Sequence, residues 1–262
     1  MILELRKGIN KRGVPFAAQT IKHQVVLIRR LFNLAMVWEL YSGENPATGK
    51  KIKMPKVDNV VTEMLTEQEL KRLLSTLENY HDLQTANLVK FALFTGLRRG
   101  EIFNLKWEDV DLENGWVDIK DSKGGKSQVI PLNKLALEVL RKHPQTEGSP
   151  YIFPGRNGKK RKEFKTAWKT IKKLANLPSN FRFHGLRHTY GSFLASSGEV
   201  DLYTLQRLLT HKGPAMTQRY AHLTEERLRK GSAVIEKVIE KVMGNLKTPM
   251  KNKNNSKTLS NS

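Results

Sequence analysis

The first strong pattern along the chain is a helical stripe of apolar residues near its start. Over residues 20–41, apolar side chains recur at the three- and four-residue spacing that places them on one face of an α-helix. The stripe consists of Ile21, Val25, Ile28, Phe32 and Ala35. Gly43 and the pair Asn45-Pro46 follow and are typical of a helix end. We therefore expect one amphipathic helix here, after an irregular basic segment over residues 1–19.

A second helix begins with a capping signal. Thr66 and Glu69 have the spacing of a capping box, and Leu65 and Leu70 have that of a hydrophobic staple. We expect this helix to run to about Glu78. A third helix, from about residue 85, should end at Thr95-Gly96, where glycine permits a tight turn. Its expected core residues are Leu88, Phe91, Ala92 and Phe94.

Between Trp107 and Leu132 the apolar period changes from helical to two, which is typical of strands. Three short strands are expected, around residues 110–112, 116–119 and 129–132, with turns at Asn114-Gly115 and Gly124-Gly125. Helical patterns return over residues 135–142, then at a stripe of Phe164, Ala167, Trp168, Ile171 and Leu174, and finally at four stretches between 184 and 243. The predicted fold is therefore mainly α with a small three-stranded antiparallel sheet (α+β).

Charge changes the picture most. The 262 residues carry 46 Lys and Arg against 25 Asp and Glu, a formal net charge of +21, which favours a polyanionic partner such as nucleic acid. A merely basic, ribosomal-type protein is the alternative from charge alone. The chain has no cysteine, so disulfides and thiol chemistry are excluded. We find no apolar run that would span a bilayer and no signal-peptide pattern, so we expect a cytoplasmic, nucleoid-associated protein.

The chemistry-bearing residues gather between His184 and Tyr220. His184 and Arg187 share one face of a predicted helix start, and a following helix delivers His211 before the Gly213-Pro214 break. With Arg98 from upstream, this set offers two guanidinium groups, two imidazoles and a phenol. Guanidinium forks bind the non-bridging oxygens of a phosphodiester, and a hydroxyl can attack its phosphorus. The set therefore favours chemistry on phosphodiesters.

Three boxes carry a family resemblance: T-G-L-R-R-G-E at 95–101, H-G-L-R-H at 184–188, and His211 followed after eight residues by Tyr220. In this order, with a lysine-bearing hairpin between the first two, they resemble those of the tyrosine recombinases, the phage-integrase family. The resemblance covers roughly residues 62–243. It implies a partial helical core-binding, DNA-clamping domain over 1–57, a catalytic domain over 58–243 and a disordered basic tail over 244–262.

The resemblance also implies residue roles. Tyr220 would attack the scissile phosphate to give a 3′-phosphotyrosine, which a partner-strand 5′-hydroxyl resolves without metal, ATP or other cofactor. Arg98 and Arg187 would grip the phosphate oxygens, His184 would accept or orient the phenolic proton, and His211 would donate a further hydrogen bond. Lys123 would protonate the leaving 5′ oxygen, with Lys126 as its nearest rival. Glu101 and His188 are expected in supporting positions.

Double-stranded DNA is the partner implied, and basic residues outside the boxes are candidate phosphate contacts. They are Lys50, Lys51, Lys53, Lys56, Lys159, Lys160 and Arg161, together with Lys162. A solvated tether is the alternative for the first four. The C-terminal helix, over 224–243, would dock onto a neighbouring protomer in a homo-tetramer, or else pack within its own chain. The N-terminal domain is shorter than the family's usual one.

Two features oppose the simplest reading. Thr210 stands where the family often has glycine, and a β-branched residue resists positive φ, so we expect the His211 loop to sit differently. His184 and His188 have the spacing of a zinc pair, but Gly185 occupies the place of the usual Glu, and we predict no metal. The alternative functions are a non-catalytic DNA-binding remnant and relaxation of supercoils, as in type IB topoisomerases.

Overall fold

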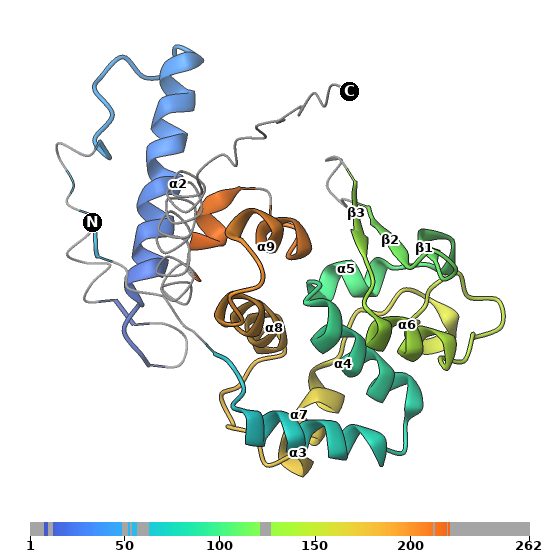
Figure 1. Ribbon diagram of the computed structural model, residues 1–262. Helices are drawn as coiled ribbons and strands as arrows, with labels where there is room; N and C mark the ends of the chain where they lie inside the picture. Colours follow the sequence, from blue (N-terminus) through green and yellow to red (C-terminus); the bar gives the residue numbers. More distant parts are fainter. Residues whose placement is uncertain are drawn as a thin grey trace, which may run out of the picture. The chain divides into compact units, whose positions relative to one another are not determined.

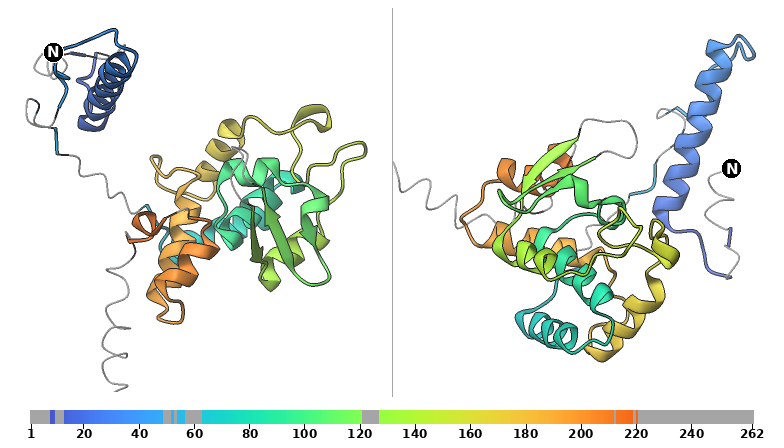
Figure 2. Two further views of the ribbon diagram at one scale, coloured as in Figure 1. Left: turned by 90° about the horizontal axis from the view of Figure 1, so that it is seen from above. Right: turned by 90° about the vertical axis from the view of Figure 1, so that its right-hand side faces the viewer.

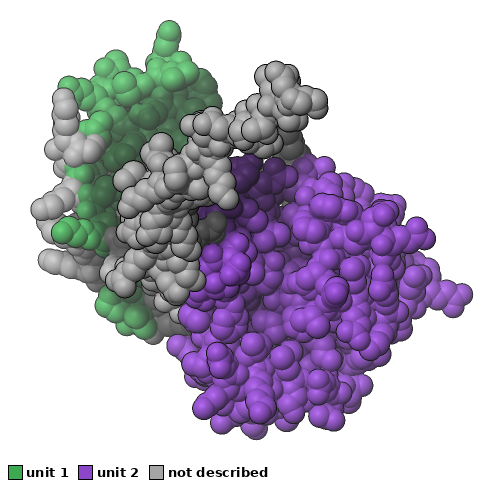
Figure 3. Space-filling view, viewed as in Figure 1, with its two compact units in different colours: residues 1–61 green, residues 62–262 purple. Residues whose placement is uncertain are grey.

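The computed structural model describes residues 8–9, 13–48, 52, 54–56, 63–120, 127–211, 213–218 and 220. The chain divides into two units, Met1–Val61 and Thr62–Ser262, which Figure 3 distinguishes by colour. The predicted C-terminal helix over 224–243, the tail, and the residues Lys50, Lys51, Lys53, Lys123 and Lys126 lie outside the described residues.

The first unit is built on the predicted amphipathic helix, α2 (Ala18–Val37), which buries Ile21 and Val25. The helix ends earlier than residue 41 because Glu39 takes a positive φ of 57° directly after the C-cap Trp38. The chain then folds back along the helix. Asn45 donates from Nδ2 to Arg29 O at 2.9 Å, and Arg29 Nε donates to Ala47 O at 2.7 Å.

The second unit is mainly helical (Figure 1). Its central helix is α4 (Leu83–Thr95), which is buried on nearly every side and packs against α3, α5, α6 and α8. The capping box of α3 is present, since Thr66 N donates to Glu69 Oε2 at 2.8 Å and Glu69 N donates to Thr66 Oγ1 at 3.3 Å. The other helices have these bounds: α3 (Glu67–Glu78), α5 (Arg99–Asn104), α6 (Lys134–Arg141), α7 (Lys165–Leu174), α8 (Gly185–Ser196) and α9 (Leu202–Leu208).

The predicted three-stranded antiparallel sheet lies at the edge of this unit, in the order β1-β2-β3 (Figure 2). Its strands are β1 (Val110–Asp111), β2 (Trp116–Ile119) and β3 (Gln128–Pro131). The register pairs Val117 with Ile130, and both side chains are buried. Trp116 and Val129 point to the other face and are about half exposed, as a period of two requires. The mainly helical α+β fold is thus confirmed.

Among the described residues of the second unit, apolar side chains form two separate clusters. The larger one runs from Leu65 to Leu186 and includes Phe91 of α4 and Phe153, whose ring centroids are 5.5 Å apart. The smaller one joins α8, α9 and the chain after them through Ala195, Leu205, Leu209 and Tyr220. The smaller cluster places Tyr220 beside α8, the helix that has His184 as its N-cap and carries Arg187.

Among the described helices, none combines the length and apolar character needed to cross a membrane.

Candidate active site

The first arginine of the site is presented by the turn between α4 and α5. Gly96 caps α4 with a left-handed φ of 64°, and Arg98 is the N-cap of α5. Glu101 holds Arg98 through two contacts: its Oε2 accepts from Arg98 N at 2.7 Å and its Oε1 accepts from Arg98 Nη1 at 2.8 Å. The carboxylate is therefore placed to orient the arginine, and the Arg98 side chain keeps about 33% of its surface exposed.

Gly96 has no acceptable substitute at this turn. A Cβ added there would lie 2.4 Å from Cδ1 of Tyr190, in addition to the left-handed φ. We expect Gly96→Ala to lower the free energy of unfolding by roughly 2–4 kcal/mol, from backbone strain and overpacking together. Gly100→Ala is the control, because a Cβ at Gly100 meets nothing within 4 Å. Thermal unfolding of both variants measures this; equal melting temperatures would contradict the requirement.

The second arginine, Arg187, is buried in α8, with only 3% of the residue exposed. Its Nη1 donates to Gly96 O at 2.8 Å and its Nη2 donates to Leu209 O. Gly96 is the C-cap residue of α4 and Leu209 that of α9. Carbonyls at helix C-termini lack partners within the helix and carry the negative end of its dipole. Two helix ends therefore converge on one guanidinium and fix its plane.

A pair of rings links α8 to the phenol. His188 Nδ1 and Tyr220 Oη are joined by a hydrogen bond of 3.0 Å, and the His184 and His188 rings meet edge-on with centroids 4.8 Å apart. The family resemblance assigns contact with the phenol to His184. His188 makes this hydrogen bond in the structure, one helical turn further along the same face. The spacing of 184 and 188 places both rings on one face of the helix, so the sequence alone leaves open which of them meets the phenol.

His211 lies on the loop that leads from α9 to the tyrosine. The residue is 8% exposed, and its Nδ1 is joined to Thr217 Oγ1 by a hydrogen bond of 2.7 Å. Thr217 in turn accepts at its carbonyl from Tyr220 N at 2.9 Å. In the part of the chain that the structure describes, the expected short helix after Gly213 includes a 3-10 turn, η3 (Pro214–Met216). The imidazole and the phenol are thus connected through one threonine.

Thr210 contradicts the expectation that a β-branched residue would avoid the backbone conformation of a glycine. It takes φ 49°, in the left-handed region. Its carbonyl oxygen accepts from Arg98 Nη1 at 2.9 Å, its Oγ1 accepts from the same nitrogen at 2.8 Å, and Oγ1 donates to Glu101 Oε1 at 3.0 Å. These contacts stabilise the conformation that the side chain disfavours.

Tyr220 is 2% exposed, so its phenol is covered in this state. Gly191 makes room for it, since a Cβ on that glycine would lie 2.8 Å from Tyr220 Cζ. A nearby tyrosine, Tyr190, is a poor nucleophile: burial raises the pKa of its phenol, although the Arg187 charge lowers it.

Beside the site, a pocket of about 700 Å³ is lined by Arg98 and His184 but not by Tyr220. It is also lined by Arg99, Lys165, Lys172 and Arg182.

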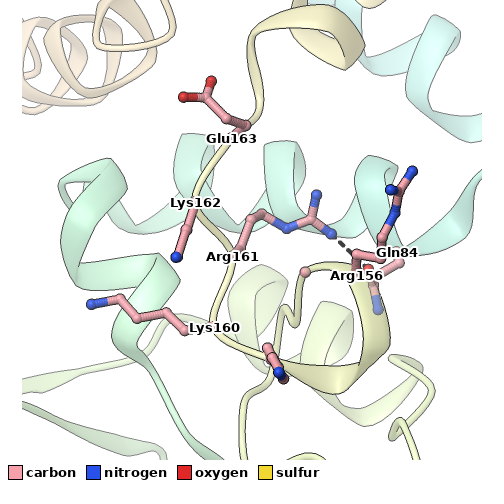
Figure 4. A pocket seen from close by; sticks show the side chains of 8 residues that line it. Gln84, Arg156, Lys160, Arg161, Lys162 and Glu163 are labelled. Atoms are coloured by element: carbon pink, nitrogen blue, oxygen red, sulfur yellow. Dashed lines mark hydrogen bonds between the residues drawn. The ribbon is translucent and has the colours of Figure 1, made fainter.

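The second basic group, at residues 159–162, is not uniform. Figure 4 shows Arg161 turned toward Gln84, whereas Lys160 and Lys162 extend away from that contact. Arg161 Nη2 donates to Gln84 Oε1 at 2.6 Å and to Pro154 O at 2.8 Å. Burial lowers the pKa of Arg161, while the Asp82 carboxylate raises it. The Arg161 guanidinium therefore organises the loop. The charges that the loop exposes to solvent are those of Lys159, Lys160 and Lys162.

Of the other candidates, Lys56 is exposed in the first unit. In the part of the chain that the structure describes, no group of three or more histidine and acidic side chains is placed to hold a metal ion. Direct contacts join one group of site residues: Arg98, Glu101, Arg187 and the segment 209–211. A second group adjoins the first and consists of His184, His188 and Tyr220.

A mainly helical domain with two oriented arginines, paired histidines and a tyrosine defines the class of enzymes that join a tyrosine to DNA during strand cleavage. Residues 63–227 match the model of the phage integrase family. The chain belongs to this family and is a tyrosine recombinase.

Relatives and solved structures agree. The chain is 35% identical over 203 residues to the tyrosine recombinase XerA of Pyrococcus horikoshii, covering 74% of this chain and 68% of that protein. It is 31% identical over 206 residues to the integrase of Salmonella phage P22, covering 71% of this chain and 50% of the integrase. The Tn1549 transposon integrase, solved with circular intermediate DNA, superposes with a TM-score of 0.67 at 20% identity, over 88% of this chain and 82% of that one. At that identity the likeness shows the fold.

Proposed function

We propose that this chain performs site-specific strand exchange on double-stranded DNA, with Tyr220 as nucleophile and Arg98 and Arg187 as the phosphate-binding pair. The observation that carries this is the shared anchoring of the two arginines. Leu209 O accepts from Arg187 and Thr210 O accepts from Arg98, on adjacent residues of one loop. Two guanidinium groups held side by side suit the non-bridging oxygens of one phosphodiester.

The reaction follows from these groups. The phenolic oxygen forms a bond to phosphorus as the bond to the 5′ oxygen breaks, leaving a 3′-phosphotyrosine and a free 5′-hydroxyl. A free phenol has a pKa of about 10, so its proton needs an acceptor at neutral pH. His188 is hydrogen-bonded to the phenol, and the His184 ring adjoins the His188 ring. Lys123 remains our candidate for protonating the leaving oxygen, and His211 for a further hydrogen bond to phosphate.

Attack requires the phenol to leave its covered position. Tyr220 Oη is bonded to His188, and the residue is almost fully buried. The basic pocket is lined by Arg98 and His184, so an incoming phosphate would meet Arg98 there. We infer that Tyr220 shifts when DNA binds, so that the phenol reaches the phosphate beside Arg98.

The net charge of +21 supports affinity for the DNA backbone. The loop at 159–162 contains two kinds of basic residue: exposed lysines, and Arg161, which is bonded within the protein. Replacing Lys159 and Lys160 with alanine should weaken DNA binding and reduce the salt slope by about one for each phosphate that is no longer bound. Arg161→Ala should instead lower the free energy of unfolding by roughly 1–3 kcal/mol, since it leaves buried acceptors unpaired. Filter binding at several salt concentrations and thermal unfolding distinguish the two; equal effects of all three substitutions on binding alone would contradict this division.

Assembly and location extend the proposal. We propose a homo-tetramer on paired DNA sites, coupled through the C-terminal helix over 224–243, and a nucleoid-associated location in the cytoplasm. Lys50, Lys51, Lys53 and Lys56 are proposed to contact phosphates.

A nicked duplex tests the function. A pool of nicked duplexes with a randomised central site is incubated with the wild-type chain, with and without EDTA, and the DNA that stays bound in SDS is sequenced. We expect covalent complexes on a subset of sequences, formed equally with EDTA present. Binding without any covalent complex would indicate the DNA-binding remnant instead, and trapping without sequence preference would favour the topoisomerase-like activity. Loss of trapping with EDTA would contradict the mechanism.

A further inference from the structure

A threonine holds a left-handed backbone conformation at the centre of the site. Thr210 is 4% exposed and takes φ 49°, which L residues with a branched Cβ rarely adopt. A glycine would take the same conformation without strain. Strained backbone persists where the surrounding contacts over-determine it, and such residues cluster at functional sites. The contacts of Thr210 explain what the threonine adds.

The hydroxyl of Thr210 has matching partners on both sides. Its oxygen accepts from Arg98 Nη1 at 2.8 Å, and its proton is donated to Glu101 Oε1 at 3.0 Å. A hydroxyl is suited to this place because it accepts and donates at once. Both partners are charged, which makes each bond stronger than one between neutral groups. Arg98 and Glu101 are also paired directly, so the three groups close a ring of contacts.

The same residue connects the arginine to the rest of the site. Thr210 follows Leu209, whose carbonyl accepts from Arg187, and precedes His211. Its own carbonyl accepts from Arg98 at 2.9 Å. The segment Leu209–His211 therefore touches both guanidinium groups and carries an imidazole. The orientation of Arg98 relative to Arg187 depends on this segment.

We propose that Thr210 is a positioning residue for the phosphate-binding arginines: its hydroxyl fixes the Arg98 guanidinium against Glu101 and couples it to the loop of Arg187 and His211. This inference rests on the proposed function. Glycine at this position would keep the carbonyl contact but would lose the hydroxyl. The side chain thus contributes to the rate of cleavage at the expense of backbone strain.

Three substitutions of Thr210 separate positioning from folding. Thr210→Gly should raise the melting temperature or leave it unchanged, because strain is relieved, yet slow single-turnover cleavage about tenfold through loss of a charge-assisted bond. Thr210→Ser keeps the hydroxyl and should cleave within about threefold of wild type. Thr210→Val keeps the branch without the hydroxyl, and should lose both stability and rate. The substrate is the nicked duplex that the wild-type chain traps best from the randomised pool.

The control is Asn176→Gly, which relieves a similar left-handed φ of 48° at an exposed position whose carbonyl accepts from Arg72. It should leave cleavage unchanged. DNA affinity should be the same for all variants, so that the change appears in the rate and not in binding. Thr210→Gly cleaving as fast as wild type, or Thr210→Ser cleaving as slowly as Thr210→Gly, would overturn the proposal.

A double-mutant cycle of thermal unfolding provides a readout independent of cleavage. Thr210→Val and Glu101→Ala are measured singly and together. We expect their effects on stability to be smaller together than their sum, because both remove the same bond. Additive effects would overturn the contact. If the wild-type chain forms no covalent complex at all, the proposed function fails, whereas the cycle still decides whether the hydroxyl couples to Glu101.

Discussion

Replacing Tyr220 with phenylalanine should abolish the covalent complex while leaving DNA binding intact. The substitution removes only the hydroxyl that bonds His188, and the ring still packs beside Gly191 and in one apolar cluster with Leu209. Without the nucleophile, trapping on a nicked duplex should fall by at least about 1,000-fold. Stability should change by only about 1 kcal/mol, the net contribution of one hydrogen bond. Gel electrophoresis in SDS measures the complex, and gel shift measures binding.

Tyr203→Phe is the matched control for this prediction. Tyr203 lies on α9, close to Tyr220 in sequence, but its side chain is 67% exposed and outside the cluster of site residues. It should form the complex at the wild-type rate. If Tyr220→Phe still trapped DNA and Tyr203→Phe did not, the choice of nucleophile would be wrong.

Replacing Arg187 with lysine should reduce cleavage by about 100-fold or more, although the charge is kept. Arg187 bonds two carbonyls from two helix ends, Gly96 O and Leu209 O, through different nitrogens. An ammonium group is a single point of charge and cannot reproduce that planar fork. Misplacing a phosphate-binding charge removes electrostatic stabilisation of the transition state, which we expect to be the main source of rate enhancement. Single-turnover cleavage at saturating protein measures the effect.

Arg72→Lys supplies a control with the same kind of contact. Arg72 lies on α3 and donates to Ala175 O and Asn176 O, both at 3.1 Å, just after the end of α7. It should lower the melting temperature without changing the rate of cleavage. Equal loss of cleavage in both variants would mean that Arg187 acts only through stability.

Local signals in the sequence predict much of the fold. The capping box at Thr66 and Glu69, the glycine turn at Gly96 and the alternation around Val117 are determined by residues close together in the chain, and all are present. The end of α2 is the exception, because apolar residues continue past Val37 in the sequence. The chain there is turned back by contacts of Asn45 with Arg29, which lie 16 residues apart.

The features of the candidate site that the sequence leaves open share a physical cause. Arg161 belongs to a uniform run of basic residues, and only the tertiary contact with Gln84, 77 residues away, distinguishes it. The intrinsic preference of the Thr210 side chain opposes a positive φ, but bonds to Arg98 and Glu101 outweigh that preference. The partner of the phenol depends on how α8 is rotated about its axis, which the spacing of His184 and His188 leaves open. Residue types predict the chemistry, and distant contacts decide the geometry.

Mass spectrometry of the trapped complex tests the central claim most directly. The covalent complex is digested with nuclease and trypsin, and the peptide that carries the residual nucleotide is fragmented to locate it. We expect a nucleotide joined through its 3′ phosphate to the phenolic oxygen of Tyr220, with a 5′-hydroxyl on the released strand. A nucleotide attached to any other residue, or a linkage through the 5′ phosphate, would contradict it.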